Sequence, residues 1–384
     1  MGTVAMLPLD GIRVVELGQN MAAPYCGQIL GTLGADIVKV ERPEGDDARG
    51  FGPPFFAGAS VTFHATNQNK RGISLDLRED KAIAWLKHFI RGADIVIHNF
   101  RPGVIEQLGL GYDDLRAVNP RLIFGAVSGF GAHGPLRDRA GYDVIAQAIA
   151  GMFSVNGDPA GRTARVGISA LDMGSGMWLA IGCLAALRQR DVTGQGCIIE
   201  TSLFETAIAF LNQHITLNGA TGKPHPRERA GVRKVALFTS WETSDGEIVI
   251  APANDRLFQR LATVAGRPEW ATDPRFRTNA DRVAHRDHLT TELAAIMRTR
   301  STADWEAALD KANIPCAPIN GLAEVIVHPQ TNALAMLHTS PETNLKLPRI
   351  PLSFDGIRPP VRREPPTLGQ HNAEILGQAP PTAG

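Results

Sequence analysis

The sequence predicts an α/β fold, with a large domain built on a doubly wound parallel sheet and a smaller α+β domain. Runs of β-branched residues alternate with helical patterns through residues 1–217, which is typical of βαβ units in a parallel sheet. A length of 384 residues exceeds one ordinary hydrophobic core. The composition then changes to Gly, Pro, His and Arg, so we expect a linker at 218–238, the small domain at 239–320, and a second linker with a C-terminal segment at 321–384.

The opening elements form one βαβ unit. We expect a strand at 11–18, a helix that begins with proline at 24–33, and a strand at 37–41. Glu41 falls about where dinucleotide-binding folds place a ribose-binding acid, but the turn after the first strand reads GQNMAAP and lacks the GxGxxG pattern. The sequence therefore argues against NAD binding.

Further alternation completes the predicted domains. The patterns predict a helix at 81–91, strands at 95–99 and 122–128, a helix at 142–153, a long helix within 167–190, a strand at 197–201 and a helix at 202–217. The small domain is expected to begin with a hairpin turn at Asp245–Gly246 and to contain helices near 256–265, 285–298 and 302–312.

Charge and composition argue against several classes of protein. Lys plus Arg equals Asp plus Glu at 39 each, which argues against a nucleic-acid or membrane-surface partner recruited by net charge. The first residues lack the pattern of a signal peptide and no uninterrupted apolar run reaches about 18 residues, so we expect a cytoplasmic protein. The histidines and the four scattered cysteines show no metal-ligand spacing, and we predict no metal site.

Asp172 is the first candidate for chemistry, because it lies at the start of the long apolar helix with Gly174 and Gly176 directly behind it. An aspartate there has two interpretations. It caps the helix, which is the commoner role, or it is a nucleophile kept ionised by the helix N-terminus. In the second case the glycines would leave room for a ligand to approach.

Short motifs spread over nearly the whole chain resemble one family. In chain order they are GIRVVELG, LGADIVKVERPEGDDAR, NQNKRGISLDL, IHNFRPG, GYD, ALDMGSG, TGQGCIIETSLFETA, SDGEIVIA, DPRF, IPCAPI and PTLGQHNAEIL. Together they resemble the class III CoA-transferases, which include formyl-CoA and carnitine CoA-transferases and the α-methylacyl-CoA racemases. The resemblance implies that 321–384 returns to the large domain and that two chains form an interlocked homodimer.

The resemblance also implies an activity. Asp172 matches the catalytic aspartate of the family, so we expect CoA to move from an acyl-CoA donor to a small carboxylic acid through anhydride and aspartyl-CoA thioester intermediates. The backbone around Gly174 would supply N–H donors to the tetrahedral intermediates. No cofactor is expected beyond the CoA thioester. The alternatives are an acyl-CoA racemase or epimerase, and a non-catalytic acyl-CoA-binding protein.

Residue 142 distinguishes the branches of the family. Racemases carry His followed by Asp there, whereas this chain has Tyr142 and Asp143. A phenol with a pKa of about 10 is a poor base at neutral pH, which favours transfer over racemisation. Tyr142 could instead simply pack with its hydroxyl bonded. Asp143 matches an acidic residue that helps to position the site in formyl-CoA transferase, although it could equally cap a helix.

The remaining expected site residues come from matches to CoA-contacting positions of relatives. These are Arg42, Leu75, Asn99 and Phe100, with Met21 in place of a family glutamine near the thioester and Gln19 and Asn20 beside it. Solvation of Arg42 and core packing of Phe100 are the simpler interpretations. Two phosphate-contacting cations of the formyl enzyme align with Gln107 and Ala140, so Arg101, Arg137 or Arg139 is expected to replace them.

The predicted linker bears on the choice of acid. Arg227, Arg229 and Arg233 suggest a dicarboxylate acceptor, because fixed cations would hold its distal carboxylate. A solvated basic linker is an equally good interpretation. The linker lacks the consecutive glycines that cover the formyl enzyme's site, which argues against formate and oxalate as substrates.

Overall fold

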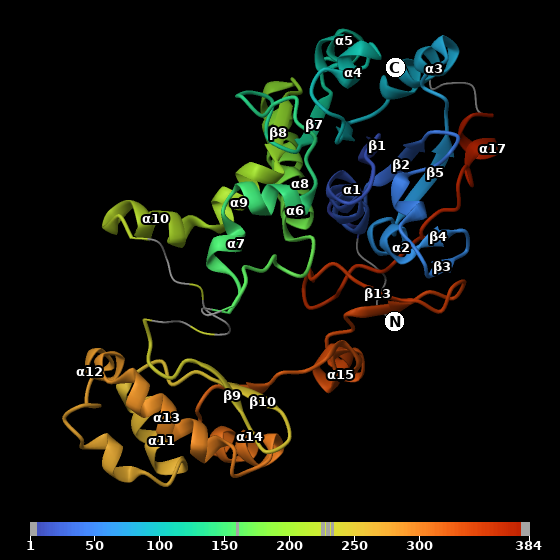
Figure 1. The fold of residues 1–384 in the computed structure, drawn as a ribbon. Coiled ribbons are helices and arrows are strands. Elements are labelled where there is room, and N and C mark those ends of the chain that lie inside the picture. Colours follow the sequence, from blue (N-terminus) through green and yellow to red (C-terminus); the bar gives the residue numbers. More distant parts are fainter. Residues whose placement is uncertain (1–5, 159–160, 224–226, 228–230, 232–233, 378–384) are drawn as a thin grey trace. The chain divides into compact units, whose positions relative to one another are not determined.

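The computed structural model describes residues 6–158, 161–223, 227, 231 and 234–377. Two compact units make up the chain (Figure 1). The large unit comprises residues 1–152, 165–223 and 329–384, and the small unit comprises residues 153–164 and 224–328.

A six-stranded, all-parallel sheet forms the centre of the large unit. Its strand order is β5-β2-β1-β6-β7-β8, which is the order of a dinucleotide-binding fold. The α/β class with a large parallel sheet is therefore confirmed. The strands are β1 (Arg13–Glu16), β2 (Asp36–Glu41), β5 (Lys70–Ser74), β6 (Ile95–His98), β7 (Ile123–Ser128) and β8 (Ile198–Ser202).

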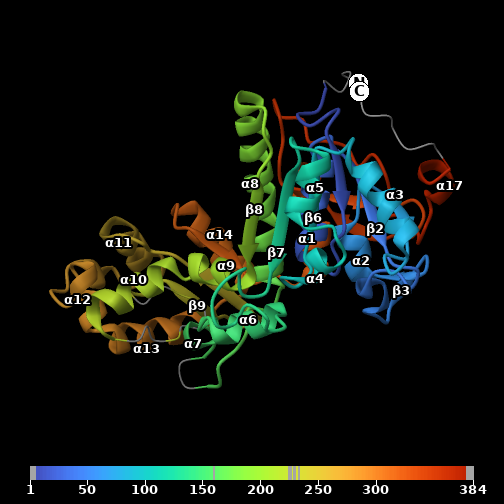
Figure 2. The ribbon, with the colours of Figure 1, turned by 90° about the horizontal axis from the view of Figure 1, so that it is seen from above.

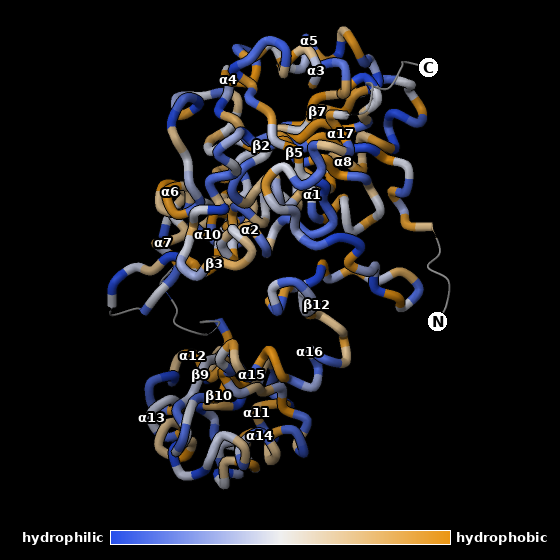
Figure 3. Tube along the Cα trace, turned by 90° about the vertical axis from the view of Figure 1, so that its right-hand side faces the viewer, coloured by the Kyte–Doolittle hydropathy of each residue, from blue (hydrophilic) through white to orange (hydrophobic). Residues whose placement is uncertain are grey.

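Helices cover both faces of this sheet (Figure 2). On one face, α3 (Asp80–Ile90), α4 (Val104–Gln107), α5 (Tyr112–Val118) and α17 (Asn372–Ile375) bury apolar side chains against the strands. On the other face, α8 (Ala170–Thr193) packs closely on β7, because Gly125 leaves room for Leu179. The hydrophobic residues gather along β7 and its neighbours (Figure 3).

Short elements complete the large unit. They are α1 (Ala22–Thr32), α2 (Val61–Thr66), α6 (Asp143–Ile149), α7 (Met152–Val155, at the boundary between the units), α9 (Leu203–Phe210), α10 (Asn212–Thr221), α16 (Pro329–Ala333), β3 (Phe55–Phe56), β4 (Ala59–Ser60), β12 (Leu337–Thr339) and β13 (Lys346–Pro348). The predicted helix at 142–153 is wrong in its extent, because it breaks between α6 and α7 where Gly151 adopts a φ of +87°.

Among the described residues, α8 is the one helix long and apolar enough to cross a membrane by length and composition. Half of its apolar stretch is buried inside the structure. Such a helix is also what the core of a globular protein requires. Its end at Gly194, with a φ of +72°, follows the usual glycine stop.

The C-terminal segment lies along the free edge of β5. Gly72 N donates to His371 Nδ1 at 3.0 Å, and Ser74 N donates to Asn372 Oδ1 at 2.9 Å. Arg71 is paired with Glu374 at 2.7 Å. The tail therefore satisfies edge N–H groups that would otherwise need another strand or water.

The small unit combines a three-stranded antiparallel sheet with helices around a core that contains Trp241, Trp270 and Trp305. The turn at Asp245–Gly246 joins its first two strands, as predicted. Its elements are β9 (Thr239–Glu242), β10 (Glu247–Ile250), β11 (Cys316–Pro318), α11 (Asp255–Val264), α12 (Asn279–Ala284), α13 (Arg286–Met297), α14 (Thr302–Lys311) and α15 (Leu322–Val327).

The observed boundaries differ from the expected ones at three places. Residues 153–164 belong to the small unit rather than to the large domain, and Gly157 pairs with Thr163 there. Residues 218–221 are helical, because α10 continues to its left-handed stop at Gly222. Helix α15 belongs to the small unit, whereas the sequence suggested a linker.

Candidate active site

The sheet has a switch point between β1 and β6, where the strand order reverses. Ligands of doubly wound sheets bind outside the carboxyl ends of the strands at this point. The loops after β1 and β6 are tied together there, because Asn99 Oδ1 accepts from Gln19 N at 2.8 Å and Asn99 Nδ2 donates to Gln19 O at 2.7 Å.

A buried ion network lies under the loop after β1. Lys39 Nζ lies 3.2 Å from Glu16 and 2.8 Å from Asp46, and it donates to Gly18 O at 2.8 Å. Asp46 also accepts from Asn20 N at 2.9 Å. Asn20 adopts a φ of +61°, which asparagine tolerates better than most residues. Fixed charges therefore determine the path of this loop.

A cavity of about 210 Å³ opens at the switch point, within the large unit. Asp172 supplies the one carboxylate among the described residues that line it. Cationic and hydrogen-bonding groups surround that carboxylate. Those that matter below are Asn20, Asn99, Arg101, Arg137, Arg139 and Tyr142.

Asp172 is the third residue of α8, so the N-cap interpretation of this residue is wrong. Ser169 occupies the N-cap position and makes no side-chain capping bond. Asp143 takes over that role, because its Oδ2 accepts from Leu171 N at 2.7 Å and from Asp172 N at 3.2 Å. The interpretation of Asp143 as a cap of its own helix is therefore wrong, because Tyr142 holds that position and Asp143 bonds to Leu171, 28 residues further along the chain.

Burial and, second, the negative charge of Asp143 raise the pKa of Asp172 to about 7. We expected the helix N-terminus to keep this carboxylate ionised, and the shift has the opposite direction. At neutral pH about half of the population carries the charge. A desolvated carboxylate with a raised pKa is a stronger base and nucleophile than one in water.

The expected role of Gly174 is wrong. A Cβ on Gly174 would lie 2.6 Å from Phe210 Cζ and 2.8 Å from Thr206 Cγ2, and one on Gly176 would lie 2.5 Å from Ala22 O. These glycines therefore let α9 and α1 approach α8. Residues past the first turn of an α-helix donate their N–H groups within the helix, which leaves the Gly174 amide unavailable to an oxyanion.

Tyr142 occupies the N-cap position of α6 without a side-chain capping bond. It lines the cavity, and 62% of its surface is exposed. The packing interpretation does not describe it in this chain. Asp143 is buried beside it, and Gln147 Nε2 donates to Asp143 Oδ1 at 2.5 Å. Sequence reasoning missed Gln147, because a single glutamine in an apolar helix gives no signal of its own.

Comparison with known proteins identifies the family of the chain. The sequence model described as CoA-transferase family III matches residues 9–372. The chain belongs to this family. It is 36% identical to the succinyl-CoA–D-citramalate CoA-transferase of Chloroflexus aurantiacus over 96% of this chain and 93% of the relative. It is 37% identical to the acetyl-CoA:oxalate CoA-transferase of Acetobacter aceti over 96% of this chain and 95% of the relative.

A solved structure agrees with this assignment. The crystal structure of a CAIB/BAIF family protein from Brucella suis shares 36% identity and a TM-score of 0.89, and the match covers 97% of this chain and 99% of the other. Family and relatives together show that this chain is an enzyme that transfers CoA.

The expected CoA-contacting residues of this CoA-transferase fall into two groups. Asn99, Phe100 and Arg101 line the cavity together with Asp172. The others lie outside that lining: Arg42 pairs with Asp47, Leu75 packs against the core, Gln19 bonds through its backbone to Asn99, and Met21 occupies the N-cap position of α1. Gln107, where the family's cation is missing, is the last residue of α4 and also lies outside the lining.

Asn20 lines the cavity where we expected Gln19 or Met21. Its left-handed backbone turns the chain between β1 and α1, and an asparagine in the short loop between a buried strand and a helix is the signal that could have singled it out. Arg137 and Arg139, named only as possible replacements, also line the cavity, together with Ala140.

The linker arginines add little to the site. Arg227 donates to Gly161 O at 2.9 Å within the small unit. Arg229 and Arg233 lie outside the described residues. The dicarboxylate hypothesis built on these three residues stays a prediction.

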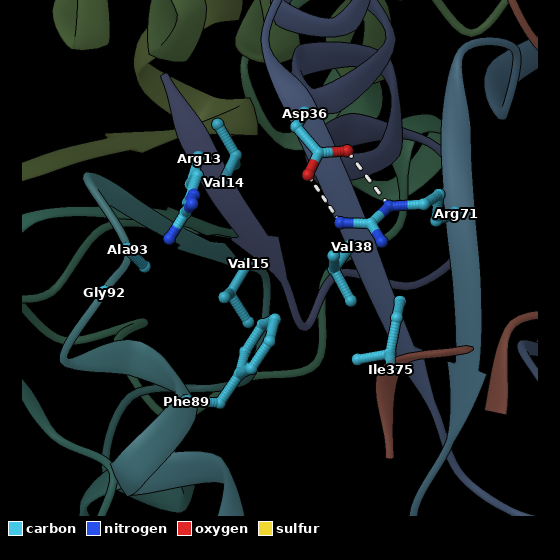
Figure 4. A pocket seen from close by; sticks show the side chains of 10 residues that line it. All are labelled: Arg13, Val14, Val15, Asp36, Val38, Arg71, Phe89, Gly92, Ala93 and Ile375. Carbon is cyan, nitrogen blue, oxygen red and sulfur yellow. Dashed lines mark hydrogen bonds and ion pairs between the residues drawn. The ribbon is translucent and has the colours of Figure 1, made fainter. Parts of the chain in front are cut away.

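A second cavity, of about 270 Å³, lies at the amino ends of β1, β2 and β5 (Figure 4). Its carboxylate, Asp36, is held by Arg71, with Nε to Oδ1 at 3.0 Å and Nη2 to Oδ2 at 2.5 Å. Apolar side chains such as Val15, Val38 and Phe89 form much of its wall. A carboxylate already paired with a guanidinium is a poor nucleophile, so the Asp172 cavity is the candidate active site.

In the part of the chain that the structure describes, no group of three or more His, Cys, Asp or Glu side chains is placed to hold a metal ion.

Proposed function

We propose that this CoA-transferase works through covalent catalysis by Asp172. The Asp172 carboxylate attacks the thioester carbonyl of an acyl-CoA donor and expels CoA thiolate, which forms a mixed anhydride. The thiolate then attacks the aspartyl carbonyl, which gives an aspartyl-CoA thioester and releases the donor acid. The acceptor carboxylate attacks that thioester and the thiolate returns to the new acyl carbonyl, so acyl-CoA forms and Asp172 is regenerated.

One observation carries this proposal: a desolvated carboxylate with a pKa of about 7 lies in a cavity at the switch point of the sheet. Partial burial leaves the carboxylate less well solvated than in water and therefore more reactive. Arg101, Arg137 and Arg139 on the cavity wall would bind anionic groups of the substrates, such as the CoA phosphates or a second carboxylate.

The substrates we propose are an acyl-CoA and a small dicarboxylic acid. The two relatives named above act, by their names, on succinyl-CoA with D-citramalate and on acetyl-CoA with oxalate. Citramalate and oxalate are dicarboxylates, and the oxalate enzyme weakens the argument against oxalate that the linker sequence suggested. Guanidinium groups near Asp172 suit a second carboxylate, because they bind it in a bidentate way.

Racemisation is disfavoured by the cavity. Exchange of an α-proton needs a base and an acid on opposite faces of the substrate. The described lining contains no histidine, and Asp172 is its one carboxylate, so it offers no second group of ordinary acidity to pair with Asp172. Proton exchange at the α-carbon without CoA transfer would nevertheless support the racemase alternative.

Mass spectrometry after incubation with succinyl-CoA or acetyl-CoA tests the mechanism, with borohydride or hydroxylamine as the trap. We expect modification confined to the peptide that contains Asp172 and its loss in Asp172→Asn. Asp191→Asn, an exposed aspartate on the same helix, is the matched control and should still be modified. Full transfer by Asp172→Asn would contradict the mechanism, and tight CoA binding without any transfer would favour the binding-protein alternative.

We also propose a homodimer, interlocked as in the family that the sequence resembles. Exposed apolar side chains follow one side of α8 at helical spacing, namely Met177, Trp178, Ile181 and Leu184. Apolar surface of this extent on consecutive turns favours burial by a second chain. The cytoplasmic location stays a prediction from the sequence.

A further inference from the structure

Gln147 connects two parts of the candidate active site through hydrogen bonds. It is fully buried in α6, its Nε2 donates to Asp143 Oδ1 at 2.5 Å, and its Oε1 accepts from Val166 N at 2.9 Å. Asp143 Oδ2 in turn holds Leu171 N and Asp172 N. A continuous chain of hydrogen bonds thus runs from the segment before α8, through Gln147 and Asp143, to the first turn of α8.

We propose that Gln147 is a positioning residue for CoA transfer: it fixes the Asp143 carboxylate against the first turn of α8 and so holds Asp172 in its reactive place. This inference rests on the proposed role of Asp172 as the nucleophile. Gln147 itself lines no part of the described cavity, so it acts through Asp143.

The two contacts require a side-chain group that both donates and accepts hydrogen bonds. Position 147 must present a donor to a carboxylate oxygen and an acceptor to a backbone N–H, and glutamine offers both at one side-chain end. A buried polar group in an apolar helix lowers stability unless it is fully bonded. Gln147 offsets much of this cost, because its amide N–H donates to Asp143 and its amide oxygen accepts from Val166.

The same contacts control the charge near the nucleophile. Burial and the Asp143 charge raise the pKa of Asp172 to about 7, so the orientation of Asp143 affects how readily Asp172 ionises. The other titratable or charged groups on the surrounding elements are Tyr25 of α1, Arg101, Arg137, Arg139 and Tyr142 of the cavity wall, Arg165 before α8, and Glu205 of α9.

Two substitutions separate positioning from general stability. Gln147→Met keeps the length of the side chain and removes both hydrogen bonds. Gln147→Glu keeps both only while the new carboxyl group is protonated, because its O–H can then donate to Asp143 and its C=O can accept from Val166 N. Gln259→Met and Gln259→Glu, on the exposed side of α11 in the small unit, are the matched controls.

The first measurement is kcat with succinyl-CoA and D-citramalate from pH 5 to 9. We expect Gln147→Met to lower kcat by about 10- to 100-fold, because small displacements of reacting groups have effects of this size. We expect Gln147→Glu to stay within about threefold of wild type at low pH. The ratio of the kcat of Gln147→Glu to the wild-type kcat should fall as pH rises, because the new carboxylate and the Asp143 carboxylate then repel each other.

The second measurement does not depend on turnover. Carbodiimide couples glycine ethyl ester to protonated carboxyl groups, so labelling of the Asp172 peptide against pH reports the ionisation of this residue. We expect its midpoint to move in Gln147→Met and to stay unchanged in both Gln259 variants. If wild type transfers no CoA, the proposed function fails, while this midpoint still decides whether Gln147 acts on Asp172.

Wild-type kcat and an unchanged labelling midpoint in Gln147→Met would overturn the proposal. If circular dichroism shows that Gln147→Met is unfolded, Gln147→Glu decides alone: a constant ratio to wild type across the pH range would contradict the positioning role, and a falling ratio would support it.

Discussion

Asp172 combines two properties that oppose each other, because it is partly buried and it must carry a charge to react. Its surroundings favour the neutral acid, since partial burial weakens its solvation and the Asp143 carboxylate lies close by. The nucleophile is therefore available only in the part of the population that has lost its proton. Reactivity at this residue comes at the expense of folding free energy.

This conflict predicts the pH dependence of the reaction. Attack requires the ionised form of Asp172, whose pKa is about 7. We expect kcat/KM to fall about tenfold for each pH unit below that value. A pH–rate profile between pH 5 and 9 measures this limb. A limb centred near pH 4, as for an aspartate in water, would contradict the buried environment of Asp172.

The same shift predicts a stability difference. A carboxyl group with a pKa raised in the folded state destabilises the fold as pH rises from its unfolded value, about 4, to its folded value, about 7. Asp172→Asn removes this term. We expect the variant to be more stable than wild type by about 1–4 kcal/mol at pH 8, with the difference shrinking towards pH 4.

Urea unfolding at the two pH values measures this difference. Asp191→Asn, on the exposed surface of the same helix, should show no such pH-dependent gain. Equal stabilities of wild type and Asp172→Asn at pH 8 would mean that the carboxylate is well solvated in the folded enzyme.

At the scale of elements, α8 organises the large unit through its glycines. Gly176 lets the backbone of α1 approach and Gly174 lets the side chains of α9 approach, so the two glycines face neighbours of different rigidity. A backbone oxygen can move only with its helix, whereas the far end of a phenylalanine side chain can rotate away.

This difference predicts unequal effects of two alanine substitutions. We expect Gly176→Ala to lower the free energy of unfolding by about 1–3 kcal/mol, because the new Cβ would lie 2.5 Å from Ala22 O. Gly174→Ala should be less harmful, because the exposed Phe210 ring can move and alanine favours the helix by about 1 kcal/mol. Thermal unfolding of both variants compares them, and an equal loss would contradict the packing argument.

The alternation of elements was predictable from sequence, because hydrophobic period and turn residues are local properties of the chain. The order of the strands and the partner of the α8 N-terminus were not. Asp143 and Leu171 lie far apart in the sequence, and no local pattern shows that a carboxylate at the start of one helix bonds to the start of another.

The candidate site shows the same difference between features that a local sequence pattern predicts and features that depend on long-range packing. The resemblance located Asp172, Asn99 and Phe100, all of which line the cavity, and the three arginines named as replacements for the missing cations line it as well. The glycine roles and Gln147 were missed or wrong, since they depend on which helix faces which. Close approach and buried hydrogen bonds are properties of the packed molecule and leave little trace in one sequence.

At the scale of the whole molecule, the apolar side of α8 predicts an oligomer. We expect light scattering to give twice the chain mass of 41.2 kDa for wild type. Trp178, with 44% of its surface exposed, lies in the middle of that side. Trp178→Glu should weaken or abolish the dimer, because a buried unpaired charge is strongly unfavourable.

Phe55→Glu provides the control, since Phe55 is also an exposed aromatic residue but lies on β3, away from α8. It should leave the mass unchanged. A wild-type mass of one chain at micromolar concentration would contradict the dimer, whatever the behaviour of the two variants.

The C-terminal tail that lies along β5 has a consequence for biosynthesis. Gly72 and Ser74 leave the ribosome early, while His371 and Asn372, which satisfy their N–H groups, follow some 300 residues later. Until translation is nearly complete, the edge strand β5 of the nascent chain has unpaired N–H groups, and exposed edge strands of this kind pair with other chains. Truncated translation products that lack the tail should therefore be the species that chaperones retain and that aggregate first.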